Sequence, residues 1–165
     1  MNANRNKLTF HSVTTKDIPI ICGFPQTAEE LFFMFPKASY PLTVEQLKAS
    51  INSRFDSNVV CYEDQCVAFA NIYEVVKDQY CCIGNVIVDP SKRGLGIGIY
   101  LLDKMIELAI QKYNVKEIRL VCFTTNVNAL LFYTKYGFKP YEIKPRKDYN
   151  NEQIASIYMK CTMIA

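Results

Sequence analysis

Three glycines at alternate positions, Gly94, Gly96 and Gly98, separate two apolar segments of the chain. Residues 86–98 read Val-Ile-Val-Asp-Pro-Ser-Lys-Arg-Gly-Leu-Gly-Ile-Gly. Glycines let backbone N–H groups approach an anion, and the N-terminus of a following helix adds the positive end of its dipole. The pattern therefore predicts a loop that binds the pyrophosphate of a ligand; the alternative is a tight turn without a ligand.

The spacing of the glycines argues against a nicotinamide or flavin dinucleotide. That fingerprint requires Gly-x-Gly-x-x-Gly (or Ala), and its last position here is Ile99 or Leu101, depending on the first glycine. The predicted strand at residues 117–123 is followed by no acidic residue to bind a ribose hydroxyl. A Walker loop is excluded because the chain contains no Gly-Lys-Ser/Thr.

A second group of polar and aromatic residues lies further along the chain. Residues 126–138 read Asn-Val-Asn-Ala-Leu-Leu-Phe-Tyr-Thr-Lys-Tyr-Gly-Phe. Together with Arg93-x-x-Gly96-x-Gly98, this segment resembles the GNAT superfamily of N-acetyltransferases. The family's acyl-CoA loop reads Arg/Gln-x-x-Gly-x-Gly/Ala, and its later signature reads Asn-x-x-Ala-x-x-x-Tyr-x-x-x-Gly-Phe. Both patterns match without a gap, and the resemblance covers residues 7–164.

The resemblance implies that the chain transfers the acetyl group of acetyl-CoA to a primary amine by direct attack within a ternary complex. It implies that Val88 N–H polarises the thioester carbonyl, as an oxyanion donor does. Valine at Gly96 or Gly98 is expected to abolish CoA binding and leave the fold largely intact. The implied cofactor-binding residues are Ile87, Val88, Arg93, Gly94, Leu95, Gly96, Ile97, Gly98, Ile99, Asn126 and Tyr133.

Tyr133 occupies the position of the family's usual general acid. A phenol with a pKa near 10 is able to protonate the departing CoA thiolate. The alternative is that Tyr133 is a core residue of an apolar helix. Asn126 matches the family asparagine that contacts the CoA arm, and it is equally suited to cap the helix that follows.

The base that deprotonates the amine has no fixed motif. Glu30 and Asn85 are the candidates for a base or for positioning a water, and Glu29 and Glu74 are weaker ones. The resemblance places the acceptor amine, a small molecule, polyamine or peptide lysine, against residues 24–40. Aromatic side chains there suit a cationic group on an apolar chain, although they also suit a hydrophobic lid. The expected acceptor-binding residues are Phe24, Glu30, Phe33, Phe35 and Tyr40.

The seven cysteines include no Cys-x-x-Cys pair, which indicates reduced thiols rather than a disulfide framework. An acetylated Cys122 is a possible intermediate, but packing explains this residue better because the only histidine, His11, lies on the first predicted strand. One histidine and scattered cysteines do not form a ligand cluster, so we expect no metal.

The composition of the chain argues against several other functions. A net charge of +3 over 165 residues is too mild to indicate nucleic-acid binding. No apolar run reaches the roughly 18 residues that cross a membrane, and residues 1–7 lack a signal-peptide core. We expect one cytoplasmic domain over residues 1–165, acting as a monomer or homodimer. A non-catalytic acyl-CoA sensor of the same fold is the alternative to an enzyme.

The elements that position these residues follow from periodicity and turn signals. The resemblance implies an α/β (α+β) GNAT fold, with a mostly antiparallel mixed sheet whose central strands splay and which helices flank. Residues 24–43 are expected to be irregular, because Pro25, Pro36 and Pro41 break regular structure. Strands are predicted at residues 7–13, 58–62, 66–76, 79–88, 117–123, 138–143 and 154–164, and helices at 17–24, from 43, at 96–113 and at 128–136.

Overall fold

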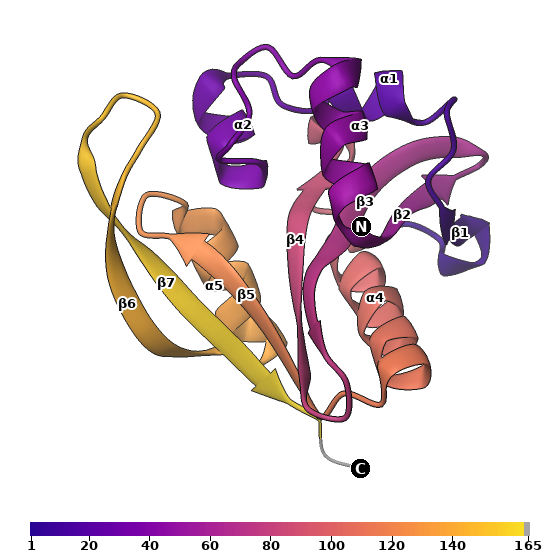
Figure 1. The fold of residues 1–165 in the computed structure, drawn as a ribbon. Helices are drawn as coiled ribbons and strands as arrows, with labels where there is room; N and C mark the ends of the chain where they lie inside the picture. Colours follow the sequence, from indigo (N-terminus) through magenta and orange to yellow (C-terminus); the bar gives the residue numbers. More distant parts are fainter. Residues whose placement is uncertain (164–165) are drawn as a thin grey trace.

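Seven strands form one mixed sheet in the computed structural model of the chain, which describes residues 1–163 (Figure 1). The strand order is β1-β2-β3-β4-β5-β7-β6, and every neighbouring pair is antiparallel except β4 and β5. The predicted fold class is confirmed. The strands are β1 (Leu8–Ser12), β2 (Phe55–Tyr62), β3 (Gln65–Val76), β4 (Tyr80–Val88), β5 (Glu117–Phe123), β6 (Lys139–Lys147) and β7 (Gln153–Thr162).

Helices cover both faces of this sheet. Two apolar cores result, because side chains alternate between the faces of a strand. One core joins α4 and α5 to the sheet, and the other joins α1, α2 and α3 to its opposite face. The helices are α1 (Ile18–Cys22), α2 (Ala28–Met34), α3 (Val44–Ser53), α4 (Ile97–Tyr113) and α5 (Val127–Tyr136), with two short 3-10 turns at η1 (Arg5–Lys7) and η2 (Pro90–Lys92).

The two parallel strands β4 and β5 separate soon after they meet. They pair only at Tyr80–Glu117, Cys81–Ile118 and Cys82–Arg119, although β4 continues to Val88 and β5 to Phe123. Asn85 adopts a φ of 51° and lies between the pairs Gly84–Asn71 and Ile87–Phe69, where β4 has one residue more than β3. A bulge bends its strand, so β4 turns away from β5 here. The predicted splay of the central strands is confirmed.

Helix α2 corrects the expectation of an irregular segment at residues 24–43. Thr27 caps it by accepting a hydrogen bond from Glu30 N–H at 3.1 Å, in the Thr-x-x-Glu spacing of a capping box. Pro25 precedes the helix and Pro36 follows it, so the prolines bound the helix rather than break it. This capping box is visible in the sequence. The prolines predict an irregular segment only when their positions relative to the capping box are ignored.

The last hairpin is longer than predicted. Strand β6 extends to Lys147 despite Pro140 and Pro145, because it forms the edge of the sheet and pairs on one side with β7. The predicted last strand is confirmed through Thr162, and its expected end at residue 164 lies outside the described residues.

All seven cysteines are free, as expected, and five of them are buried. The described residues contain no group of three or more histidine, cysteine, aspartate or glutamate side chains arranged to hold a metal ion. Within residues 1–163, none of the helices combines the length and the apolar character needed to cross a membrane.

Candidate functional site

The glycine loop joins β4 to α4 with two residues in the left-handed region. Gly94 has a φ of +78° and Gly96 a φ of +80°, a conformation that glycine adopts at little cost. Apart from Gly94 and its two chain neighbours, no heavy atom of residues 1–163 lies within 4 Å of the position that a Cβ of Gly94 would occupy. Helix α4 begins at Ile97, so the open side of the loop lies at the helix N-terminus, where anions bind.

Gly98 serves a different purpose from the other two glycines. A Cβ at this position would lie 3.3 Å from the ring of Phe132 and 3.7 Å from the side chain of Val88. The absence of a side chain therefore lets α4 approach α5 and the end of β4. The expectation that valine at Gly98 leaves the fold intact needs correction, because such a side chain would press against Phe132 within the protein itself.

The N-terminal segment lies against the loop. Ala3 N–H donates to Leu95 C=O at 2.7 Å, and the side chain of Asn2 lies 3.6 Å from the position of a Cβ at Gly96. Gly94 is thus the most open position of the loop, and Gly96 is partly covered.

The backbone N–H and C=O of Val88 face the side of β4 on which β5 no longer pairs. Asp89 N–H donates to Val67 C=O of β3 at 2.8 Å, and successive residues of a strand point their backbone groups to opposite sides. The groups of Val88 therefore point away from β3, and Arg93 Nε donates to Val88 C=O at 3.3 Å on that side. Ile87 pairs with β3 instead, and its buried side chain belongs to the core with α1, α2 and α3.

Tyr133 packs into the sheet beneath α5. Its ring makes edge contacts with Phe132 and Phe138 at centroid distances of 5.3 and 5.8 Å, and the residue is 8% exposed. Burial, and then the neighbouring thiol of Cys122 on β5, raise the pKa of Tyr133 above the ordinary value of a phenol. The hydroxyl has no hydrogen-bond partner among residues 1–163, so this proton is not engaged by the protein.

Asn126 caps α5 by accepting a hydrogen bond from Ala129 N–H at 3.3 Å. Cys122 directs its thiol toward the carbonyls of Phe123 and Asn126, at 3.9 Å each. Burial raises the pKa of Cys122 to about 12, which leaves little thiolate for nucleophilic attack. The only histidine, His11, contacts the thiol of Cys61 on β2 at 3.3 Å and is not paired with Cys122.

Asn85 is 4% exposed, and its side chain makes three hydrogen bonds. Its carbonyl oxygen accepts hydrogen bonds from Ser50 Oγ at 2.6 Å and from Asn71 Nδ2 at 2.9 Å, while its amide donates to Met34 C=O at 2.9 Å. Arg54 extends the network by donating to Asn71 at 3.1 Å. The network ties the bulge of β4 to α2 and α3, which favours a structural role for Asn85 over the positioning of a water.

Glu30 forms an ion pair with Arg93 at 2.9 Å. Its second oxygen accepts a hydrogen bond from Gln26 N–H at 2.6 Å. Burial alone would raise the pKa of Glu30, but the hydrogen bonds from Arg93 and Gln26 outweigh it, and the pKa is lowered. Of the weaker base candidates, Glu29 is exposed beside it. Glu74 accepts a hydrogen bond from Tyr80 at the start of β4, where β5 still pairs and far along the strand from Val88.

The aromatic residues expected to bind the acceptor have different environments. Phe24 and Phe35 are core residues, with 3% and 8% exposure. Phe33 is half-buried, and Tyr40 is exposed and donates its hydroxyl hydrogen to Gln26 C=O at 3.1 Å. No observation assigns them to an acceptor, and their role stays a prediction.

A family profile connects this geometry with known proteins. The profile of the acetyltransferase (GNAT) family matches residues 24–138, which is more than half of the chain. The chain belongs to the GNAT acetyltransferase family. The match includes the glycine loop, Asn126, Tyr133 and the final Gly-Phe of the second signature.

Solved structures of GNAT acetyltransferases share the fold. A spermidine N-acetyltransferase from Vibrio cholerae, crystallised with CoA and spermine, is 15% identical with a TM-score of 0.79, and 96% of each chain is covered. Ard1 from Thermoplasma volcanium is 21% identical with a TM-score of 0.77, over 96% of this chain and 99% of the other. The ribosomal-protein-S18-alanine N-acetyltransferase from Escherichia coli is 22% identical with a TM-score of 0.69, and 96% of each chain is covered.

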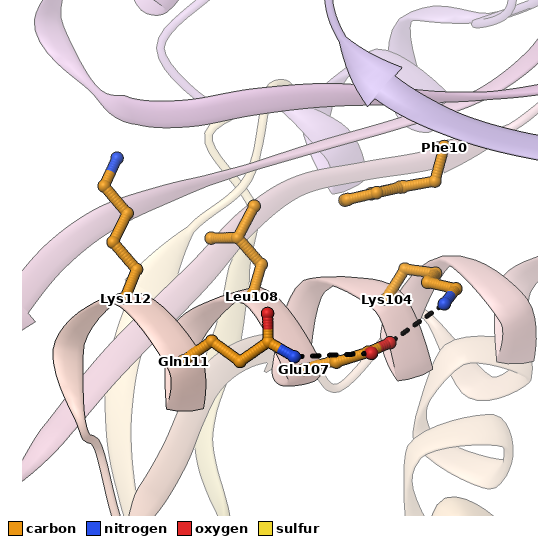
Figure 2. A pocket seen from close by; sticks show the side chains of 6 residues that line it. All are labelled: Phe10, Lys104, Glu107, Leu108, Gln111 and Lys112. Atoms are coloured by element: carbon orange, nitrogen blue, oxygen red, sulfur yellow. Dashed lines mark hydrogen bonds and ion pairs between the residues drawn. The ribbon is translucent and has the colours of Figure 1, made fainter.

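A surface pocket of about 390 Å³ lies elsewhere on this GNAT protein, along α4 (Figure 2). Its charged residues are already paired: Lys104 and Gln111 contact Glu107 at 2.9 and 3.5 Å, and Lys112 pairs with Asp56 at 2.6 Å. The pocket shares no residue with the glycine loop or with Tyr133. It is lined by Phe10, Lys104, Glu107, Leu108, Gln111 and Lys112.

A cluster of aromatic residues and one arginine at the end of β5 was not predicted. Phe123 stacks on Phe32 of α2 with centroids 4.5 Å apart, and Tyr149 of the β6–β7 loop lies 6.0 Å from Phe32. The guanidinium of Arg146 lies over both phenylalanine rings. These residues are far apart in sequence and follow no motif, so only the tertiary structure brings them together.

Proposed function

We propose that this GNAT protein transfers the acetyl group of acetyl-CoA to a primary amine by direct attack. The observation that carries the proposal is the combination of three features around the separated strands β4 and β5. These are the outward-facing backbone of Val88, the open loop at Gly94, and the unengaged hydroxyl of Tyr133, whose neighbour is the thiol of Cys122 on β5. Acetyl-CoA is the co-substrate in this proposal, and no step requires a metal.

Each group has a defined task in the reaction. The N–H groups of residues 94–99 would bind the pyrophosphate at the start of α4. Val88 N–H would donate to the carbonyl oxygen, where negative charge grows as the amine attacks. Tyr133 would then give its proton to the departing thiolate, and its raised pKa keeps it protonated until that step.

The contacts of Glu30 and Asn85 favour positioning roles. Glu30 holds Arg93, which in turn reaches Val88 C=O, and Asn85 fixes the bulge that turns β4 from β5. A carboxylate with a lowered pKa is a weak base, and the side-chain oxygen of Asn85 already accepts two hydrogen bonds. The assignment of either residue as the base stays a prediction.

An assay of thiol release separates the enzyme from a CoA-binding sensor. Purified protein is incubated with acetyl-CoA and a panel of amines, and acetylated product is identified by mass spectrometry. We expect thiol and acetyl-amine in equal amounts with at least one amine. CoA binding by calorimetry without thiol release for any amine would contradict the proposal and support the sensor.

A variant of the loop tests the cofactor site. Gly94→Asn adds a side chain where the protein leaves open space, and asparagine tolerates the left-handed backbone, as six asparagine and aspartate residues with positive φ in this chain do. We expect CoA affinity to fall at least about tenfold, since the added atoms occupy ligand space. Lys92→Asn, on the preceding turn, is the matched control. Equal affinity of Gly94→Asn and the control would contradict the assignment.

A further inference from the structure

Arg146 differs from the other arginines in having no polar partner for its side chain. Each of the other four has a side-chain partner within hydrogen-bond or ion-pair distance among residues 1–163. Arg146 has none in that part of the chain, although its guanidinium carries five N–H donors. The four pairs are Arg5–Asp103 at 3.4 Å, Arg54–Asn71 at 3.1 Å, Arg93–Glu30 at 2.9 Å and Arg119–Glu117 at 2.5 Å.

Two aromatic rings lie beside this guanidinium. Its central carbon lies 5.7 Å from the ring centroid of Phe32 and 5.4 Å from that of Phe123. The two rings stack on each other, and each residue is 5% exposed. Cation–π attraction acts at these distances and leaves the N–H groups of the guanidinium free to bind a ligand. Arg146 is thus a half-buried cation beside two aromatic rings.

The location of Arg146 relates it to the proposed reaction. Phe123 is the last residue of β5, directly after Cys122, and Phe32 belongs to α2, whose Met34 carbonyl binds Asn85 of β4. The cation therefore lies where α2 and the β6–β7 hairpin meet the end of β5, beyond the point where β4 and β5 separate (Figure 1). The glycine loop lies with α4 and α5 on the face of the sheet opposite to α2.

We propose that the acceptor is an amine that also carries a carboxylate, and that Arg146 binds this carboxylate. The inference rests on the proposed function. A guanidinium donates two parallel N–H bonds to the two oxygens of a carboxylate, which is stronger and more directional than a neutral contact. The carboxylate belongs to a free amino acid or to a peptide with an acidic residue. A polyamine, which has no carboxylate, would leave Arg146 without a partner.

Acceptor pairs that differ only in the carboxylate test this inference. Lysine and cadaverine form one such pair for free amino acids, and the dipeptides alanyl-glutamate and alanyl-glutamine, both amidated at the C-terminus, form one for peptides. The measured quantity is the ratio of kcat/KM within each pair, from thiol release with saturating acetyl-CoA. We expect at least one pair to favour the carboxylate member by about ten- to a hundred-fold. The pair that does so identifies the source.

Two substitutions of Arg146 test whether this residue causes the difference in kcat/KM within a pair. Arg146→Gln is expected to bring the favoured ratio close to one, and Arg146→Lys, which keeps the charge without the planar fork, to retain only part of it. Lys144→Gln is the matched control: it removes the same charge two residues away on β6, where Lys144 already pairs with Glu142 at 3.6 Å. Thermal unfolding curves establish that each variant is folded.

The outcomes separate the two proposals. Acetylation of cadaverine or alanyl-glutamine with no preference for their carboxylate partners would overturn the inference and leave the proposed function standing. A preference that Arg146→Gln and Arg146→Lys both retain would overturn it as well. If no amine of the panel releases thiol although CoA binds, the proposed function fails, and the inference fails with it.

Discussion

At the scale of single residues, the site is distinguished by polar groups that the protein does not use for its own stability. Tyr133 lies in an apolar core, yet its hydroxyl has no partner among residues 1–163, and Arg146 is the arginine without one. Both groups are accessible to a ligand, because Ser57 Oγ is the one fully buried side-chain polar atom without a partner among residues 1–163. Asn85 is the opposite case, because its side chain makes three hydrogen bonds within the protein.

The Tyr133→Phe variant tests the general acid. The phenylalanine ring keeps the contacts with Phe132 and Phe138, and the lost hydroxyl has no hydrogen bond to break. We expect kcat to fall about a hundredfold, with the KM for acetyl-CoA and the melting temperature unchanged. Because the pKa of Tyr133 is raised, the wild-type rate should show no decline attributable to this residue up to about pH 10.

Tyr136→Phe is the control on the same helix. Its hydroxyl donates to Asp103 at 2.7 Å, so its loss should lower the free energy of unfolding by about 1 kcal/mol and leave kcat unchanged. The assignment would be wrong if Tyr133→Phe retained the full kcat, or if the two variants lost the same fraction of it.

At the scale of elements, α2 connects the glycine loop to the opposite face of the sheet. Its first turn holds Arg93 through Glu30, and its middle packs Phe32 on the end of β5. The sequence predicted the loop, α4 and α5 with nearly correct ends, because each has a local signature of glycines, caps or apolar periodicity. The contacts of α2 were not predictable, since they join residues that are distant in the chain.

The ion pair between Glu30 and Arg93 predicts a pH-dependent contribution to stability. The pKa of Glu30 is lower in the folded protein, so the stabilisation is present above about pH 4.3, the pKa of an unfolded glutamate, and is lost as the pH falls through the folded pKa. The side chains are 27% and 46% exposed, so solvent screens the pair and its contribution is about 0.5 kcal/mol.

Denaturant unfolding at pH 7 and pH 3 measures this effect. Glu30→Gln should be less stable than wild type at pH 7, and the difference should shrink at pH 3. Glu29→Gln is the matched control, because Glu29 shares the first turn of α2 and its dipole but is exposed. Equal destabilisation by both variants would show that the helix dipole, and not the ion pair, is responsible.

At the scale of the whole molecule, the separation of β4 and β5 organises the site. The bulge at Asn85 turns β4 away, the two apolar cores support the sheet from both faces, and the backbone of Val88 is left facing outward. The resemblance implied this splay, and the structure confirms it. Its cause, a network of buried polar side chains from α3, β3 and β4, has no signature in sequence spacing, because Ser50, Asn71 and Asn85 are each unremarkable alone.

The buried cysteines have a consequence for measuring the stability of this protein. Burial raises the pKa of all seven thiols, to about 12 for Cys66, Cys81 and Cys122 and to about 11 for Cys82. At pH 8, a thiol with a pKa of 12 is ionised in only about one molecule in ten thousand.

Iodoacetamide should therefore label the folded chain slowly and the unfolded chain quickly, at up to seven sites counted by mass spectrometry. Rapid labelling of Cys122 in native buffer would contradict this expectation. Otherwise the thiols act as internal reporters of unfolding, and a brief alkylation pulse would give the unfolded fraction even in a cell lysate.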